Sequence, residues 1–142
     1  PFGQARRVLL VGFICYLSTE VGFAHKTQPH NISALWPTSA ILFSVLVVVP
    51  VRHSWAYILA AYFGSVINDA RGGFPIAALL FLVAGIVEIL VAAVGVRRFA
   101  GGARAFESLR GVVAYIIVAV LLAPFVSAFV GAFAGGMENY WF

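Results

Sequence analysis

The chain has 142 residues, of which 63% are hydrophobic and only 10% are charged, and its mean hydropathy is +1.02. Soluble domains carry about 25% charged residues, and a soluble fold of this size cannot bury so much apolar surface. The composition therefore excludes a soluble globular domain. It indicates an integral membrane protein built of helices, because a helix satisfies its own backbone hydrogen bonds in lipid.

The basic residues do not indicate a nucleic-acid partner. The formal net charge is +4, but the arginines stand in short clusters at the ends of apolar runs, where membrane-orientation signals belong. Cys15 is the only cysteine, so the chain forms no internal disulfide. No spacing of cysteine and histidine fits a metal site, and we expect neither a metal nor another cofactor.

The apolar runs predict five membrane spans, since a spanning helix needs about 20 apolar residues, with a range of about 17–25. The runs cover residues 8–24, 33–51, 54–68, 74–96 and 111–134. The third run extends only about 22 Å at about 1.5 Å per residue. It either continues into Asp69, thins the membrane locally or is re-entrant. We expect an all-α, polytopic helix bundle that forms a single domain over residues 1–142.

The basic residues also predict the orientation of the chain. With the N-terminus in the cytoplasm, seven of them fall inside and two, Lys26 and Arg71, fall outside, as the positive-inside rule requires. The seven are Arg6, Arg7, Arg52, Arg97, Arg98, Arg104 and Arg110. The aromatic ending at Phe142 follows a polar turn and is typical of the entry to a further span. We therefore expect this sequence to be part of a longer chain or domain.

Glu88 is the first candidate functional residue. It lies in the fourth run, about 12–14 Å from the Arg97 end. A carboxylic acid at that depth is costly, and by default it faces the bundle interior and has a partner. Glu88 is either a ligand or proton site, or a hydrogen-bonded packing residue. We expect its side chain to face other helices, with Ser39 and Ser127 as candidate donors.

The start of the second run, from Asn31 to Ala40, is the second candidate. Trp36 belongs at the outer interface of the membrane. Pro37 is tolerated in the first turn of a helix, and Ser39 stands two positions after it. The free amides of such a helix start can hold an anion. The alternative is an ordinary capped helix.

A third group of polar residues lies near the predicted outer face. Glu20, Asn68 and Asp69 are there together with Lys26 and Arg71. These residues either line one shallow polar pocket or are solvated loop charges joined by local salt bridges.

Small residues four positions apart allow close helix packing. Ala60 with Gly64 and Gly131 with Gly135 are such pairs. Pro124 predicts a kink in the fifth run, where Ser127 can satisfy the carbonyls that the proline frees.

The sequence shows no arrangement typical of an enzyme. It contains no pair of nucleophile and general base, no phosphate-binding loop and no histidine cluster. Its glycine-rich stretches follow no predicted strand. We therefore expect no catalytic activity.

Four stretches, which begin at Leu35, Tyr62, Gly85 and Pro124, follow one another as four motifs do in a known family. They resemble the first family of bacterial membrane-associated sensor domains, the first MASE family. The stretch from Leu35 to Ala40 resembles its Trp-Pro-x-Ser-Gly signature, with alanine where the family usually has glycine. The other three stretches are Tyr62-Phe63-Gly64 to Asn68, Gly85 to Glu88 followed by Leu90, and Pro124-x-x-Ser127-Ala128. The similarity covers the N-terminal part of that family, whose further spans lie beyond Phe142.

The resemblance implies a sensory input domain that is not itself catalytic and precedes a cytoplasmic histidine kinase or diguanylate cyclase. We interpret the chain as a multi-pass sensor of the bacterial inner membrane, a homodimer or part of a larger membrane complex, that shifts helices relative to one another. One alternative is a small structural subunit packed against partners or pigments, although no histidine lies mid-span to bind a pigment metal. The other is a transporter fragment, which Glu88 suits, but the halves show no inverted repeat.

Overall fold

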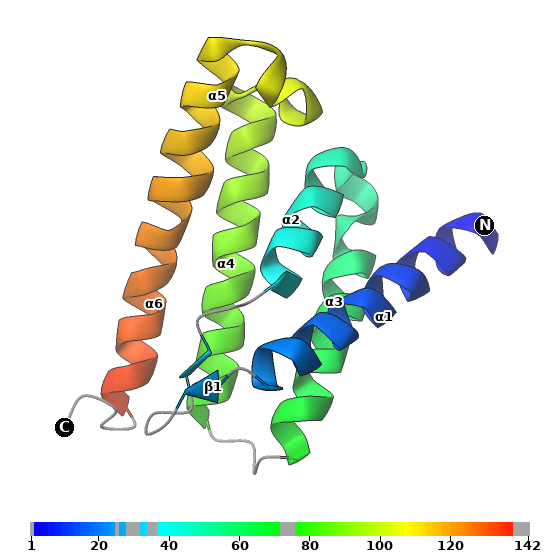
Figure 1. Ribbon diagram of the computed structural model, residues 1–142, viewed down its shortest axis with the longest axis vertical. Coiled ribbons are helices and arrows are strands. Elements are labelled where there is room, and N and C mark those ends of the chain that lie inside the picture. The colour runs from blue at the N-terminus through cyan, green and yellow to red at the C-terminus, as the bar shows by residue number, and fades with distance from the viewer. Residues whose placement is uncertain (1, 25, 28–31, 34–36, 72–75, 138–142) are drawn as a thin grey trace. The chain divides into compact units, whose positions relative to one another are not determined.

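The computed structural model describes residues 2–24, 26–27, 32–33, 37–71 and 76–137 (Figure 1). These residues are helical apart from one antiparallel ladder of two residues on each side and the short connections at residues 49–50, 100–101 and 108. The elements are α1 (Phe2–Ala24), β1 (Lys26–Thr27), β2 (Ile32–Ser33), α2 (Pro37–Val48), α3 (Val51–Arg71), α4 (Ile76–Phe99), η1 (Gly102–Glu107), α5 (Leu109–Tyr115), η2 (Ile116–Leu122) and α6 (Ala123–Met137). The expected all-α class agrees with this architecture.

The second apolar run forms a shorter helix than the sequence predicts. α2 has 12 residues and extends about 18 Å. Ser33, expected at the start of this helix, belongs instead to β2. Prolines set both limits. Pro37 opens the helix because its missing N–H costs nothing at the first position, and Pro50 closes it because it cannot donate to the carbonyl four residues earlier.

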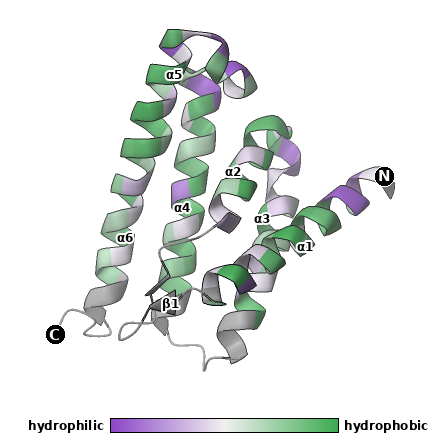
Figure 2. Cartoon of the chain, viewed as in Figure 1, coloured by the Kyte–Doolittle hydropathy of each residue, from purple (hydrophilic) through white to green (hydrophobic). Residues whose placement is uncertain are grey.

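The third run forms a longer helix than the sequence predicts. α3 has 21 residues, which extend about 31 Å, so length alone no longer argues against a span. Within the described residues, two helical stretches are long and apolar enough to cross a membrane, Leu79–Phe99 and Leu109–Phe133. Figure 2 shows hydrophobic residues along most of the second stretch, which comprises α5, η2 and α6.

The chain folds into two compact units. Unit 1 comprises residues 1–42 and 50–74, and unit 2 comprises residues 43–49 and 75–142. In unit 1, α1 packs against α3. In unit 2, α4 packs against α6, with η1 and α5 at one end of the pair (Figure 1). The core at this end consists of Val96, Ala100 and Ala105, with Phe43, Val47, Ala114, Tyr115 and Ala119 packed against it.

Within unit 2, Arg97 of α4 binds the C-terminal end of α2. Pro50 has no N–H for the Leu46 carbonyl, and the His53 N–H donates to Pro50 O at 2.9 Å instead of reaching Val49 O. The carbonyls of Leu46 and Val49 each accept a hydrogen bond from the Arg97 guanidinium. A cation at a helix C-terminus is also favoured by the helix dipole. Arg97, expected only as an orientation charge, is therefore also a helix cap.

The fifth run is one continuous helix with a π-helical segment in its middle. This segment, Ile116–Leu122, ends where the Ala123 N–H donates to the Val118 carbonyl five residues earlier. Pro124 follows directly, and in a regular α-helix its ring would clash with the carbonyl of Val120. The wider π turn accommodates the proline without ending the helix.

Candidate functional site: a buried hydroxyl cluster

Two glycines let α1 and α3 approach closely in unit 1. A Cβ atom added to Gly12 would lie 3.1 Å from the Ala60 Cβ, and one added to Gly64 would lie 3.0 Å from the Tyr16 Cβ. Ala60 and Gly64, expected as packing residues, thus both lie at the contact between α1 and α3. The close approach leaves no room for long side chains, so polar groups in this contact must be short.

Three buried hydroxyl groups meet in unit 1. They belong to Thr19 of α1, Thr38 of α2 and Ser65 of α3, whose side chains are at most 8% exposed. Thr19 Oγ1 lies 3.1 Å from Thr38 Oγ1 and 3.5 Å from Ser65 Oγ. Both threonines also donate to the Cys15 carbonyl, at 2.9 Å from Thr19 and 3.2 Å from Thr38. The cluster therefore joins three different helices through uncharged hydrogen bonds.

The hydrogen bonds of this cluster have more than one arrangement. Four contacts join the three hydroxyls and the Cys15 carbonyl, but each hydroxyl has a single proton to donate. If Thr19 donates to the carbonyl, it can accept from Thr38 or Ser65. If Thr19 instead donates to the Thr38 hydroxyl, then Thr38 donates a hydrogen bond to the Cys15 carbonyl. Small helix movements can therefore change which bond is made without leaving a buried group unpaired.

Local sequence places each hydroxyl at this point. In α1, Thr19 and Ser18 both bond to the carbonyl four residues earlier, a habit of short hydroxyl side chains in helices. The Thr19 hydroxyl also faces other helices, whereas the Ser18 hydroxyl bonds to the Ile14 carbonyl of its own helix and is more exposed. Thr38 follows Pro37, the first residue of α2, so its side chain comes from the opening turn of that helix.

Three of the site residues that the sequence predicts in unit 1 are neighbours in sequence of the cluster residues. Glu20 follows Thr19, and Pro37 and Ser39 flank Thr38; all three are partly buried. Asn68 and Asp69 lie in the last turns of α3, but their side chains fall outside the described residues, as does all of Trp36. An anion site was expected at the start of the second run. Among the described residues there, Thr38 is buried, and its hydroxyl bonds to other helices.

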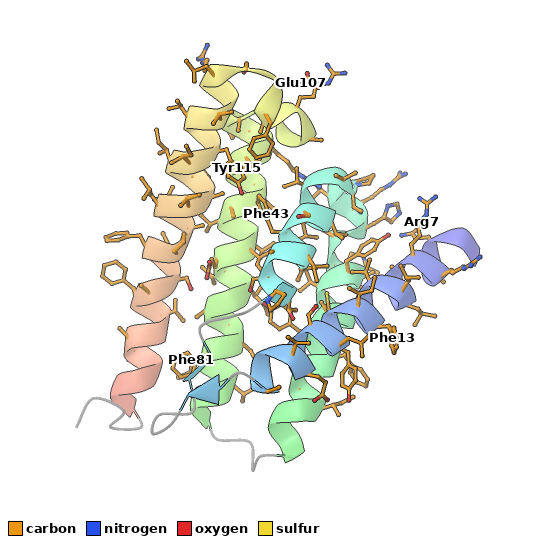
Figure 3. The ribbon with its side chains drawn as sticks, viewed as in Figure 1. Arg7, Phe13, Phe43, Phe81, Glu107 and Tyr115 are labelled. Carbon is orange, nitrogen blue, oxygen red and sulfur yellow. The ribbon has the colours of Figure 1, made fainter. Side chains whose placement is uncertain are left out.

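The remaining predicted site residues lie in unit 2. Glu88 is partly buried near the middle of α4, and Ser127 is buried in α6, the helix that packs against α4. Gly131 has room for a Cβ atom, whose nearest neighbour would be a Phe81 ring carbon at 3.8 Å. Gly135 lies in α6, with its surroundings outside the description. Figure 3 shows the side chains that surround these helices.

Sequence reasoning missed Thr19 and Ser65, and it passed over Thr38 between two residues that it chose. Each is a short hydroxyl residue that interrupts an apolar run, and each stands directly beside a flagged position, Glu20, Gly64 or Pro37. That signal was available. A single sequence does not show, however, which face of each helix meets the others.

We expect Thr38→Val to lower the free energy of unfolding by about 0.5–2 kcal/mol, because it removes one hydroxyl and weakens the pairing of the Cys15 carbonyl. Valine keeps the shape of threonine, so packing changes little. Far-UV circular dichroism during titration with a denaturing detergent measures the change. Ser18→Ala is the matched control, since the Ser18 hydroxyl bonds within its own helix. An equal loss in both variants would contradict a role of the cluster in joining helices.

Within the described residues, no group of three or more histidine, cysteine, aspartate or glutamate side chains is arranged to hold a metal ion.

In comparisons with known proteins, the family model MASE1 matches residues 7–142. No curated protein and no solved structure matches the chain.

Proposed function

Because the chain belongs to the MASE1 family of membrane-associated sensory domains, we propose that it is the input domain of a bacterial inner-membrane sensor. In this proposal it crosses the membrane several times and relays a signal to a cytoplasmic histidine kinase or diguanylate cyclase, without catalysing a reaction itself. The observation that carries the proposal is the family match, which extends over almost the whole chain.

The buried hydroxyl cluster supports a mechanism of helix shift. Interhelical hydrogen bonds in membrane proteins contribute only about 0.6 kcal/mol each on average. A network of such bonds with alternative arrangements therefore holds α1, α2 and α3 together without fixing one geometry. A ligand or partner needs only a modest difference in affinity to move the balance between two arrangements. A single charged pair in the same place would resist such a shift far more strongly.

The Thr38 hydroxyl tests this mechanism in the full-length protein. We expect Thr38→Val to shift the basal output of the attached kinase or cyclase, whereas Thr38→Ser, which keeps the hydroxyl, stays close to wild type. Output is measured at matched protein levels in membranes. Wild-type output from both variants would exclude the cluster from signalling and leave only its role in stability.

We further propose five spans with the N-terminus in the cytoplasm, in which α2, with 12 residues that extend about 18 Å, is a short second span where the bilayer thins locally. The basic residues support it, as do the length of α3 and the two long apolar stretches. An alkaline phosphatase fused after Phe106 should be inactive, because this enzyme needs the periplasm, whereas a fluorescent protein that matures only in the cytoplasm should be bright there. High phosphatase activity at Phe106 would contradict the topology. The same pair of reporters fused after Thr27, with the opposite result, serves as the control.

Glu88 is proposed as a second element of signal reception. A partly buried carboxyl group in an apolar helix is a functional candidate by default. We expect Glu88→Gln to keep the fold and change the output, since glutamine preserves the shape and most hydrogen-bonding capacity. Glu88→Leu should destabilise the protein if donors from other side chains pair with the carboxyl group. Unchanged output in Glu88→Gln, together with unchanged stability in Glu88→Leu, would show that Glu88 faces lipid or water.

A further inference from the structure

The end of the α4–α5 hairpin in unit 2 combines exposed cations with exposed apolar side chains. It lies between the two stretches that are long and apolar enough to cross a membrane, because one ends at Phe99 and the other begins at Leu109. Six exposed residues of this end define what we call the hairpin-end patch: Arg98, Phe99, Arg104, Phe106, Leu109 and Arg110.

The hairpin-end patch stands on an ordered turn. Gly101 and Gly102 have φ angles of 83° and 64°, which favour glycine, and they let the chain reverse after α4. Ser108 then caps α5 by accepting a hydrogen bond from the Gly111 N–H at 3.1 Å. The Ala105 side chain is buried beneath the turn. The three arginines are therefore presented from a fixed backbone and not from a loose loop.

The charge of this end is positive and outward-facing. Arg97 keeps its charge but is not part of this surface, because its guanidinium is turned toward the carbonyls at the end of α2. Arg98, Arg104 and Arg110 are all exposed, and Glu107, which Figure 3 labels at this end, is the one exposed acid among residues 97–110. Three positive charges and one negative charge leave a net charge of +2 on the surface of the turn.

We propose that the hairpin-end patch binds the headgroups of anionic phospholipids. Its position at the ends of two apolar stretches places it at the level of headgroups when these stretches cross the bilayer. Phe106 and Leu109 are 69% and 81% exposed, and such side chains enter the boundary between headgroups and acyl chains while the arginines bind phosphate. A site for a soluble phosphate would not need this apolar fringe. The inference rests on the proposed membrane insertion and not on sensing.

The expected strength follows from the number of arginines. Each basic residue close to an anionic membrane surface strengthens attachment about fivefold at moderate ionic strength, and salt weakens the effect. Three arginines on an ordered turn therefore give a clear preference for anionic over zwitterionic lipid. Glu107 opposes the preference, so its removal should increase it.

A fluorophore on the turn tests the proposal. Ala103 is exposed and Cys15 is fully buried, so a maleimide dye reacts selectively with Ala103→Cys in the otherwise complete chain. The labelled protein is reconstituted into phosphatidylcholine vesicles, and quenching is titrated with phosphatidylglycerol that carries a nitroxide near the top of its acyl chain. The reference is phosphatidylcholine with the same nitroxide. We expect half-maximal quenching at a mole fraction of phosphatidylglycerol that is lower by about fivefold or more.

Charge variants decide the outcome. The triple change Arg98→Gln, Arg104→Gln and Arg110→Gln should bring the two lipids to within about twofold of each other, while Glu107→Gln should widen the preference. The Arg6→Gln and Arg7→Gln pair removes exposed charges from α1 and should leave quenching at Ala103→Cys unchanged. Equal quenching by both lipids in the parent protein, or loss of the preference on adding millimolar inorganic phosphate, would overturn the proposal. Quenching by neither lipid would overturn the membrane insertion as well.

Discussion

Gly111→Ala is expected to destabilise unit 2 by about 1–3 kcal/mol, the usual cost of forcing an extra group into packed structure. A Cβ atom at this position would lie 2.3 Å from the carbonyl oxygen of Ala105 and 3.1 Å from that of Ala100. Both obstacles are backbone atoms, so no side-chain rotation relieves the clash. The turn around η1 or the start of α5 must move instead, and the small core beneath it opens.

Gly131→Ala is the control for this change. It makes the same substitution in the same continuous helix, where the nearest atom to the new Cβ is 3.8 Å away. Alanine there should be neutral or should stabilise by up to about 1 kcal/mol, because alanine favours a helix over glycine. Both variants are compared by detergent denaturation followed by circular dichroism. Equal stability of the two variants would contradict the close approach of the Ala105 carbonyl oxygen to Gly111.

Arg97→Met is expected to lower the free energy of unfolding by about 1.5–3 kcal/mol, because hydrogen bonds to charged groups are among the stronger ones. The substitution keeps much of the apolar stem but removes both hydrogen bonds to α2. The carbonyls of Leu46 and Val49 are then left without the donor that Pro50 made necessary. With both carbonyls deprived of this donor, the end of α2 should fray.

Arg98→Met is the matched control for Arg97→Met. The two residues are adjacent in α4 and carry the same charge, but Arg98 is exposed. Its loss should change the stability by less than about 0.5 kcal/mol. Hydrogen exchange at the amides of α2 distinguishes the variants further, since only Arg97→Met should speed exchange there. Equal losses of stability in both would mean that charge at this end, and not the cap on α2, is what matters.

The sequence predicted the helices well because its apolar runs are long and continuous. It misjudged α2 because hydropathy does not register where a helix ends, and the run 33–51 is apolar beyond both prolines. It took Arg97 as an orientation signal only. The second role requires knowing that α4 brings this side chain to the end of α2, which is a tertiary contact and not a local pattern.

The candidate site was located only in part from the sequence. Attention to charge led to Glu20 and Glu88, and attention to motifs led to Pro37 and Ser39. The groups that actually meet are the uncharged hydroxyls of Thr19, Thr38 and Ser65. A lone hydroxyl in an apolar run is too common to stand out. It becomes informative only when packing shows that three of them face one another across helices.

In the proposed function, residues 7–142 make the output of a larger sensor responsive. Replacing this segment in the full-length protein with an unrelated bundle of five spans, at the same membrane level and orientation, tests it most directly. Kinase or cyclase activity is then recorded across growth conditions in which the wild-type output varies. We expect the output of the chimera to stay constant across those conditions. An output that still varies as in the wild type would contradict it.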